Sequence, residues 1–176
     1  MTLRPLLVYI AGWLLAAAAV AVVVLVLLSG DEDPVALPPV QETELSSAAT
    51  NAGCVLRAGD DAPASPPLSG PRAVPAAPGV YDAPPPARAL VGALRHGTIV
   101  ILYRPESAQD AVKVLRQLQA AVPRGTIVTP YGEMPFVVAV TAWRRLLGCR
   151  AMSDRTLDAV RLFQGRFVGS GPDSPS

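Results

Sequence analysis

Residues 89–105 read ALVGALRHGTIVILYRP and carry the strongest folding signal of the chain. The first half has helical spacing, with its leucines and Val91 on one apolar face, and Gly97 suits the left-handed residue that ends a helix. The run TIVILY at 98–103 is rich in β-branched residues and too uniformly apolar for an exposed edge strand. The stretch therefore predicts a helix over 87–96 that leads into a buried strand.

The segments that follow alternate between helical and strand-like patterns. Ser107 is suited to cap a helix, and the apolar residues that follow it at a spacing of three to four predict that this helix ends at Pro123. The runs TIVTP at 126–130 and FVVAVTAW at 136–143 predict two more strands. Ser153 is suited to cap a last amphipathic helix. The order helix, strand, helix, strand, strand, helix indicates an α+β fold, a small mixed α/β domain.

The N-terminal region contains 23 consecutive residues without a charge, Leu6 to Leu28. As a helix this run is roughly 34 Å long, which is enough to cross a bilayer. The apolar region of a cleaved signal peptide is usually shorter, about 7–15 residues, and ends at a small-x-small site that LLSGDEDP lacks. We therefore expect a transmembrane signal anchor over 6–28. Arg4 before the run and acidic residues after it predict a cytoplasmic stub, 1–5, and an extracytoplasmic C-terminal domain in the cell membrane.

Three segments outside the regular patterns are rich in proline, glycine or polar residues. Residues 29–50 predict a flexible linker and 169–176 a disordered tail, which leaves one exported domain over 51–168. Within it, 63–86 hold nine prolines among 24 residues and exclude both a helix and a central strand. This segment is either a disordered linker or an extended wrap over the domain, anchored by Tyr81.

Charge and motif content exclude several classes of function. The chain has 15 basic and 14 acidic residues, which gives no electrostatic case for nucleic acid. It has no P-loop, dinucleotide fingerprint, C-x-x-C or G-x-S-x-G motif, and no serine in a nucleophile-like context could pair with the single histidine, His96. We therefore expect no catalytic residue and no cofactor. The even cysteine count, Cys54 and Cys149, predicts one disulfide in an oxidising compartment.

Four stretches together resemble the DUF3105 family, a bacterial exported or membrane-anchored domain of unknown function. They are SPPLSGPRA (65–73), PGVYDAP (78–84), LVGALRHGTIVILYRP (90–105) and TAWRRLLGC (141–149). The resemblance covers about residues 51–168. It supports pairing of the two cysteines and favours the ordered wrap over the linker. Trp143, within the third predicted strand, is expected in the core.

The chain departs from the family's histidine-rich pattern, which reads SGPHY and H-x-L-E-H-G. That pattern implies a metal site, because it places two imidazoles one helical turn apart beside a carboxylate. The matching positions here are Arg72, Gly92, Arg95 and His96. Guanidinium groups offer no lone pair to a metal and glycine has no side chain, so no metal is expected at this degenerate site.

Three roles remain open for His96. It could cap the carbonyls at the end of the short helix, it could join Arg72 and Arg95 in an anion-binding patch, or it could retain a metal or catalytic role. The sequence favours a non-enzymatic accessory protein that is anchored in the lipid bilayer by its N-terminal helix and that binds another envelope protein or a small anion. The alternative is a metal-binding protein or metal-dependent enzyme with a degenerate histidine site.

Overall fold

The computed structural model describes residues 40–60, 66–106 and 109–174, all within the compact unit 39–176. The predicted stub 1–5, anchor 6–28 and first part of the linker lie outside these ranges. No helix in the described ranges is long and apolar enough to cross a membrane. The helices are α2 (Val40–Asn51), α3 (Ala87–Arg95), α4 (Gln109–Ala121) and α5 (Asp154–Phe167). The strands are β1 (Cys54–Ala58), β2 (Gly79–Val80), β3 (Ile99–Tyr103), β4 (Thr126–Pro130), β5 (Val138–Ala142) and β6 (Arg145–Cys149).

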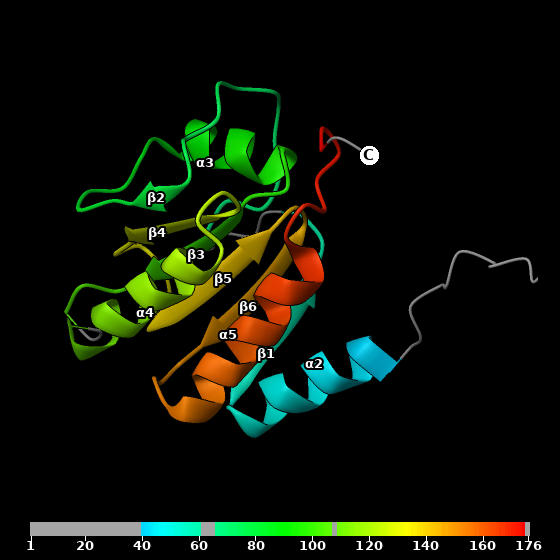
Figure 1. Cartoon of the computed structure of the whole chain (residues 1–176), viewed down its shortest axis with the longest axis vertical. Coiled ribbons are helices and arrows are strands. Elements are labelled where there is room, and N and C mark those ends of the chain that lie inside the picture. Colours follow the sequence, from blue (N-terminus) through cyan, green and yellow to red (C-terminus); the bar gives the residue numbers. More distant parts are fainter. Residues whose placement is uncertain (1–39, 61–65, 107–108, 175–176) are drawn as a thin grey trace, which may run out of the picture. The chain divides into compact units, whose positions relative to one another are not determined.

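One mixed sheet organises the domain, with the strand order β1-β6-β5-β3-β4-β2 (Figure 1). Strands β3 and β4 run parallel, as does β2 to β4, while the pairs β3–β5, β5–β6 and β6–β1 are antiparallel. The parallel pair β3–β4 is joined by a crossover through α4, as parallel strands require. All five residues of β3 are buried, which confirms the strand predicted over 98–103.

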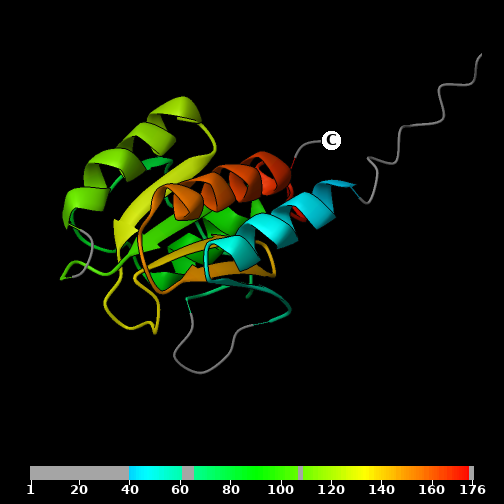
Figure 2. The ribbon, with the colours of Figure 1, turned by 90° about the horizontal axis from the view of Figure 1, so that it is seen from below.

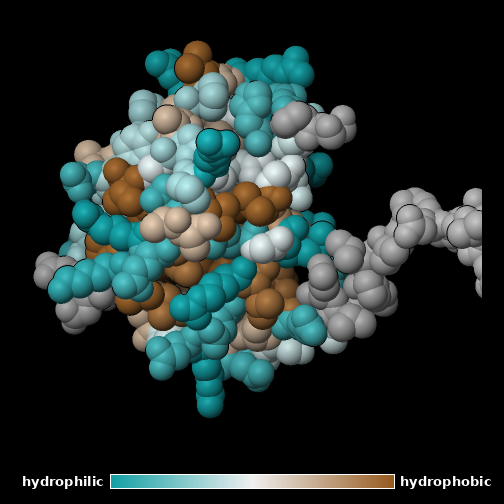
Figure 3. Space-filling model, in the orientation of Figure 1, coloured by the Kyte–Doolittle hydropathy of each residue, from teal (hydrophilic) through white to brown (hydrophobic). Residues whose placement is uncertain are grey.

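The residues of β3 alternate between two apolar cores. Ile99, Ile101 and Tyr103 face a core shared with α2, α4 and α5. Val100 and Leu102 face the other core, which includes Leu90 and Leu94 of α3 and Leu68 of the Pro-rich segment (66–86, its described part). The sheet is therefore covered on both faces, and helices α2, α4 and α5 lie together on one of them (Figure 2). On the side of the molecule that Figure 1 presents, hydrophobic residues lie at the surface among hydrophilic ones (Figure 3).

Helix α2 corrects the predicted linker, because residues 40–50 are helical rather than flexible. The helix is mostly polar, and among its residues 42–51, Leu45 and Ala49, one turn apart, are the ones that are buried. These two side chains pack in the core beside α5. A helix with so narrow an apolar stripe is stabilised by its tertiary contacts, which hydrophobic periodicity does not report.

Strands β1 and β6 are also absent from the predicted order. Trp143 and Arg144 form the tight turn from β5 into β6, where Arg144 has a φ of 56°. Strand β1 pairs with β6 at the sheet edge, and four of its five residues are exposed. The pairing brings Cys54 opposite Cys149, and their Sγ atoms lie at bonding distance, 2.09 Å. The predicted disulfide pair is thus brought together across two neighbouring strands.

Candidate functional site

The C-terminal end of α3 positions two of the candidate residues. Its apolar face is buried in the sheet, and the helix ends at Arg95, with His96 as the C-cap residue. Gly97 then adopts a φ of 78°, the left-handed conformation expected of a helix stop. The Arg95 side chain, 17 % exposed, lies over the Trp143 ring, with Cζ 5.0 Å from the ring centroid. It also donates a hydrogen bond from Nη1 to the Gly70 carbonyl at 3.3 Å.

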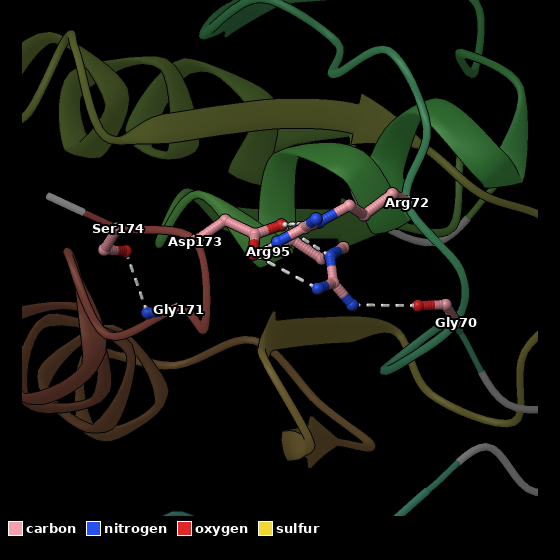
Figure 4. Close-up of polar contacts among 6 residues, drawn as sticks. All are labelled: Gly70, Arg72, Arg95, Gly171, Asp173 and Ser174. Atoms are coloured by element: carbon pink, nitrogen blue, oxygen red, sulfur yellow. Dashed lines mark hydrogen bonds and ion pairs between the residues drawn. The ribbon is translucent and has the colours of Figure 1, made fainter.

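Arg72 reaches the same place from the Pro-rich segment. Both guanidinium groups donate to the carboxylate of Asp173, as Figure 4 shows. Arg72 donates from Nη2 to Oδ1 at 2.9 Å and from Nε to Oδ2 at 3.2 Å. Arg95 donates from Nε to Oδ2 at 2.7 Å and from Nη2 to Oδ1 at 3.2 Å. Each carboxylate oxygen therefore accepts two charge-assisted hydrogen bonds, one from each arginine.

The chain segment 169–174, here called the tail, carries Asp173 to this site. It corrects the predicted disorder over these residues, while 175–176 lie outside the described ranges. The Gly169 N–H donates to the Gly97 carbonyl at 2.8 Å, and the Asp173 N–H donates to the Arg95 carbonyl at 2.9 Å. A Cβ at Gly171 would collide with the Arg95 carbonyl oxygen, so only glycine allows this approach. The tail thus satisfies carbonyls at the end of α3.

The two arginines shape the electrostatics of Asp173. Hydrogen bonds from Arg72 and then Arg95, reinforced by their charges, hold the pKa of the Asp173 carboxyl far below its usual range, although burial opposes this shift. The same contact raises the pKa of Arg72 above its ordinary value. Asp173 is 14 % exposed and Arg72 is 79 % exposed, so solvent weakens the Arg72 contact more than the Arg95 contact. Two positive charges against one negative leave the cluster with a net charge of +1.

The structure brings Arg72 and Arg95 together and leaves His96 at the margin. His96 is exposed and takes part in neither ion pair, and its backbone N–H donates to carbonyls of α3. Gly92 is buried against the Pro-rich segment, where a Cβ would lie 2.6 Å from the Ala73 carbonyl oxygen. In the described part of the chain, no group of three or more His, Cys, Asp or Glu residues could hold a metal ion.

Tyr81, the predicted anchor of the Pro-rich segment, and Trp143, expected in the core, both make contacts at this side of the sheet. The Tyr81 hydroxyl donates to the Ala77 carbonyl at 2.8 Å, and its N–H donates to the Val128 carbonyl of β4 at 2.8 Å. Trp143 is half-buried against the core and is the surface on which Arg95 lies.

Asp173 is the site residue that sequence reasoning missed. Its one local signal is the run GPDS, since glycine, proline, aspartate and serine are the residues of tight turns. The observed turn is of this kind, because the Ser174 Oγ accepts a hydrogen bond from the Gly171 N–H at 3.0 Å.

Comparison with known proteins places the chain in one family. Comparison with curated proteins gave no match, and comparison with solved structures gave none. The family model described as "Protein of unknown function (DUF3105)" matches residues 61–165, more than half of the chain. The matched range includes Arg72, Gly92 and Arg95 and stops before the tail that holds Asp173. The chain belongs to the DUF3105 family.

Proposed function

We propose that this chain is a membrane-anchored extracytoplasmic domain with a non-enzymatic binding role, and that its two-arginine site, Arg72 and Arg95, recognises an oxyanion. The observation that carries the proposal is the convergence of four guanidinium N–H groups on the two oxygens of one carboxylate. Planar guanidinium groups match carboxylate, phosphate and sulfate geometry in this way.

The surroundings of the two arginines also favour binding. Arg95 is fixed by the Gly70 carbonyl and by the Trp143 ring, so it loses little freedom when it binds an anion. The Pro-rich segment that carries Arg72 contacts α3 through a hydrogen bond from the Ala76 N–H to the Ala89 carbonyl, 2.9 Å long. We infer that this segment wraps the domain and holds Arg72 beside Arg95.

The exported location rests on the sequence and on the cysteine pair. The uncharged run 6–28 is long enough for an anchor, and Arg4 precedes it, which supports an extracytoplasmic domain by the positive-inside rule. Cys54 and Cys149 at bonding distance suit an oxidising compartment. Protease added to intact spheroplasts should digest the domain without lysis. Digestion only after lysis would contradict the proposed topology.

The oxyanion site is tested by the thermal stability of the full-length chain in detergent with added sulfate or phosphate. Asp173→Asn vacates the site, so these anions should raise the melting temperature of this variant. The double variant Asp173→Asn/Arg72→Gln should respond less, and Arg72 is exposed enough for the substitution to spare the fold. No response in Asp173→Asn would overturn the oxyanion site.

Elemental analysis of the purified chain separates this function from the metal-dependent alternative. Stoichiometric zinc, copper or iron in the unsubstituted protein would contradict a purely oxyanion-binding role. His96→Ala would then show whether the one histidine of the chain holds the metal.

A further inference from the structure

We propose that the two-arginine site binds a peptide segment, an acidic turn of the Gly-x-Asp type, and that the tail is its resident occupant in the same chain. A segment of this chemistry from an envelope partner must displace the tail. The inference rests on the proposed oxyanion site, and it names both the class of ligand and the regulation of that site.

The contacts of the tail extend beyond the carboxylate. The Arg95 carbonyl accepts the N–H of Asp173 at 2.9 Å, in addition to the side-chain bonds from the Arg95 guanidinium. The Gly97 carbonyl accepts the N–H of Gly169 at 2.8 Å. The site thus recognises an aspartate together with the backbone before it. A peptide ligand offers both of these features, and a free anion does not.

Steric fit further restricts the occupant. A Cβ at Gly171 would collide with the backbone of Arg95 and Gly97, and a Cβ at Gly97 would collide with the Gly169 backbone and the Ser174 hydroxyl. The residue two positions before the aspartate must therefore be glycine. A dipeptide or an isolated aspartate would keep the charge contacts and lose this part of the fit.

The Arg95 side of the site does not depend on the tail for its shape. Arg95 keeps its contacts with Trp143 and with the Gly70 carbonyl when the tail leaves, because neither involves the tail. Departure of the tail would remove the countercharge that Arg72 and Arg95 share. The mutual repulsion of these two guanidinium groups favours rebinding of the tail or of another acidic segment.

Tethering sets how strongly the tail competes. Only Val168 separates α5 from the tail, so a released tail stays near the site at an effective concentration in the mM range. An external segment binds only to the fraction of molecules in which the tail is released, and its apparent affinity falls by that fraction. Competition by the tail therefore excludes acidic ligands that bind the site with low affinity.

The experiment measures binding of the labelled peptide GSGPDS, residues 169–174, amidated so that aspartate is its sole carboxylate. The receptors are the full-length chain in detergent, its Asp173→Asn variant and the matched control Asp158→Asn. Asp158 is an exposed aspartate of α5 that pairs only with Arg161 among the described residues. We expect Asp173→Asn to bind the peptide at least about tenfold more tightly than the other two chains, because its tail competes less.

Two variants and one peptide establish where the peptide binds. Asp173→Asn/Arg72→Gln and Asp173→Asn/Arg95→Lys should each weaken binding, and the peptide GSGPNS should bind more weakly than GSGPDS. Arg95→Lys keeps the positive charge and removes only the planar guanidinium group. Weaker peptide binding by this variant would therefore show that binding depends on guanidinium geometry and not on charge alone.

The outcomes separate the two proposals. If sulfate stabilises Asp173→Asn but the peptide does not bind at about 10 mM, above the expected effective concentration, the oxyanion site stands and the peptide inference is wrong. If neither binds, both are wrong. Equal peptide affinity for Asp173→Asn, Asp158→Asn and the unsubstituted chain would refute competition by the tail.

Discussion

Replacing Gly92 by alanine should destabilise the domain, although the same change stabilises an isolated helix. Alanine is favoured over glycine inside a helix by about 1 kcal/mol. In α3, however, the added Cβ would lie 2.6 Å from the Ala73 carbonyl oxygen and 3.0 Å from the Pro75 Cα. Both neighbours are backbone atoms, which cannot rotate away as a side chain can. Overpacking costs about 1–3 kcal/mol, and a 2.6 Å contact with backbone places this site in the upper part of that range, about 2–3 kcal/mol. After subtraction of the helix-propensity gain of about 1 kcal/mol, we expect a net loss of about 1–2 kcal/mol.

Gly165 of α5 provides the matched control. It lies inside a helix as Gly92 does, but it is exposed, and a Cβ there would have no neighbouring atom within 4 Å. Gly165→Ala should therefore show the helix-propensity gain alone, about 0.5–1 kcal/mol. The two substitutions are chemically identical, and the structure predicts opposite signs for them.

Urea unfolding followed by far-UV circular dichroism, with the disulfide intact, measures both variants. The comparison is valid when the dependence of the unfolding free energy on urea is the same for both chains. A stabilised Gly92→Ala, similar to Gly165→Ala, would refute the reasoning. It would mean that the Pro-rich segment does not lie against α3, and the placement of Arg72 beside Arg95 would fail with it.

Three further predictions concern the disulfide, the tail and a buried amide. Reduction of the Cys54–Cys149 bond, whose cysteines are 95 residues apart, should lower the free energy of unfolding by about 4–5 kcal/mol, and an unchanged urea midpoint with dithiothreitol would contradict this. The pKa of Asp173 is lowered in the folded chain, so its contact stabilises the docked tail above the ordinary carboxyl pKa of about 4 and is lost as the pH falls through the lowered value. In the unsubstituted chain, amide hydrogen exchange of the tail, measured relative to the intrinsic rate, should therefore become faster only in acid. In Asp173→Asn it should already be fast at neutral pH. Buried Gln164 donates to the Thr126 hydroxyl at 2.6 Å and to a backbone carbonyl, so Gln164→Met should cost about 1–3 kcal/mol in thermal or urea unfolding. A neutral result would show that these polar groups find other partners.

The sequence predicts the elements whose burial matches their own periodicity. Helices α3 and α5 and strands β3, β4 and β5 all coincide with predicted segments, and the Ser153 side chain accepts a hydrogen bond from the Thr156 N–H as a helix cap. The cap predicted at Ser107 lies outside the described residues. Strand β1 is not predicted because it is an edge strand with four exposed residues. Its partner β6 is not predicted as a separate strand because it follows β5 after a turn of only two residues.

Prediction of the site is partial for a different reason. Arg72 and Arg95 are found because they replace a histidine and a glutamate of the family's proposed metal site, which suggests that the positions converge. Asp173 stands 78 residues after Arg95 within a run of turn-forming residues, and no local pattern signals a contact between them. Local periodicity and turn chemistry do not encode pairing across such a separation, which depends on the assembled fold.

The glycine at position 92 and the arginine at position 72 are structurally linked. Because Gly92 has no Cβ, the backbone of residues 73–75 lies directly against α3. Arg72 immediately precedes this contact, so the packing at Gly92 fixes where the Arg72 side chain begins. A side chain at position 92 would push the segment outward and draw Arg72 away from Arg95. Gly92→Ala should therefore weaken peptide binding in the Asp173→Asn chain as well as lower stability, whereas Gly165→Ala should leave binding unchanged. Equal peptide affinity in these two variants would show that Arg72 is positioned by contacts other than the one at Gly92.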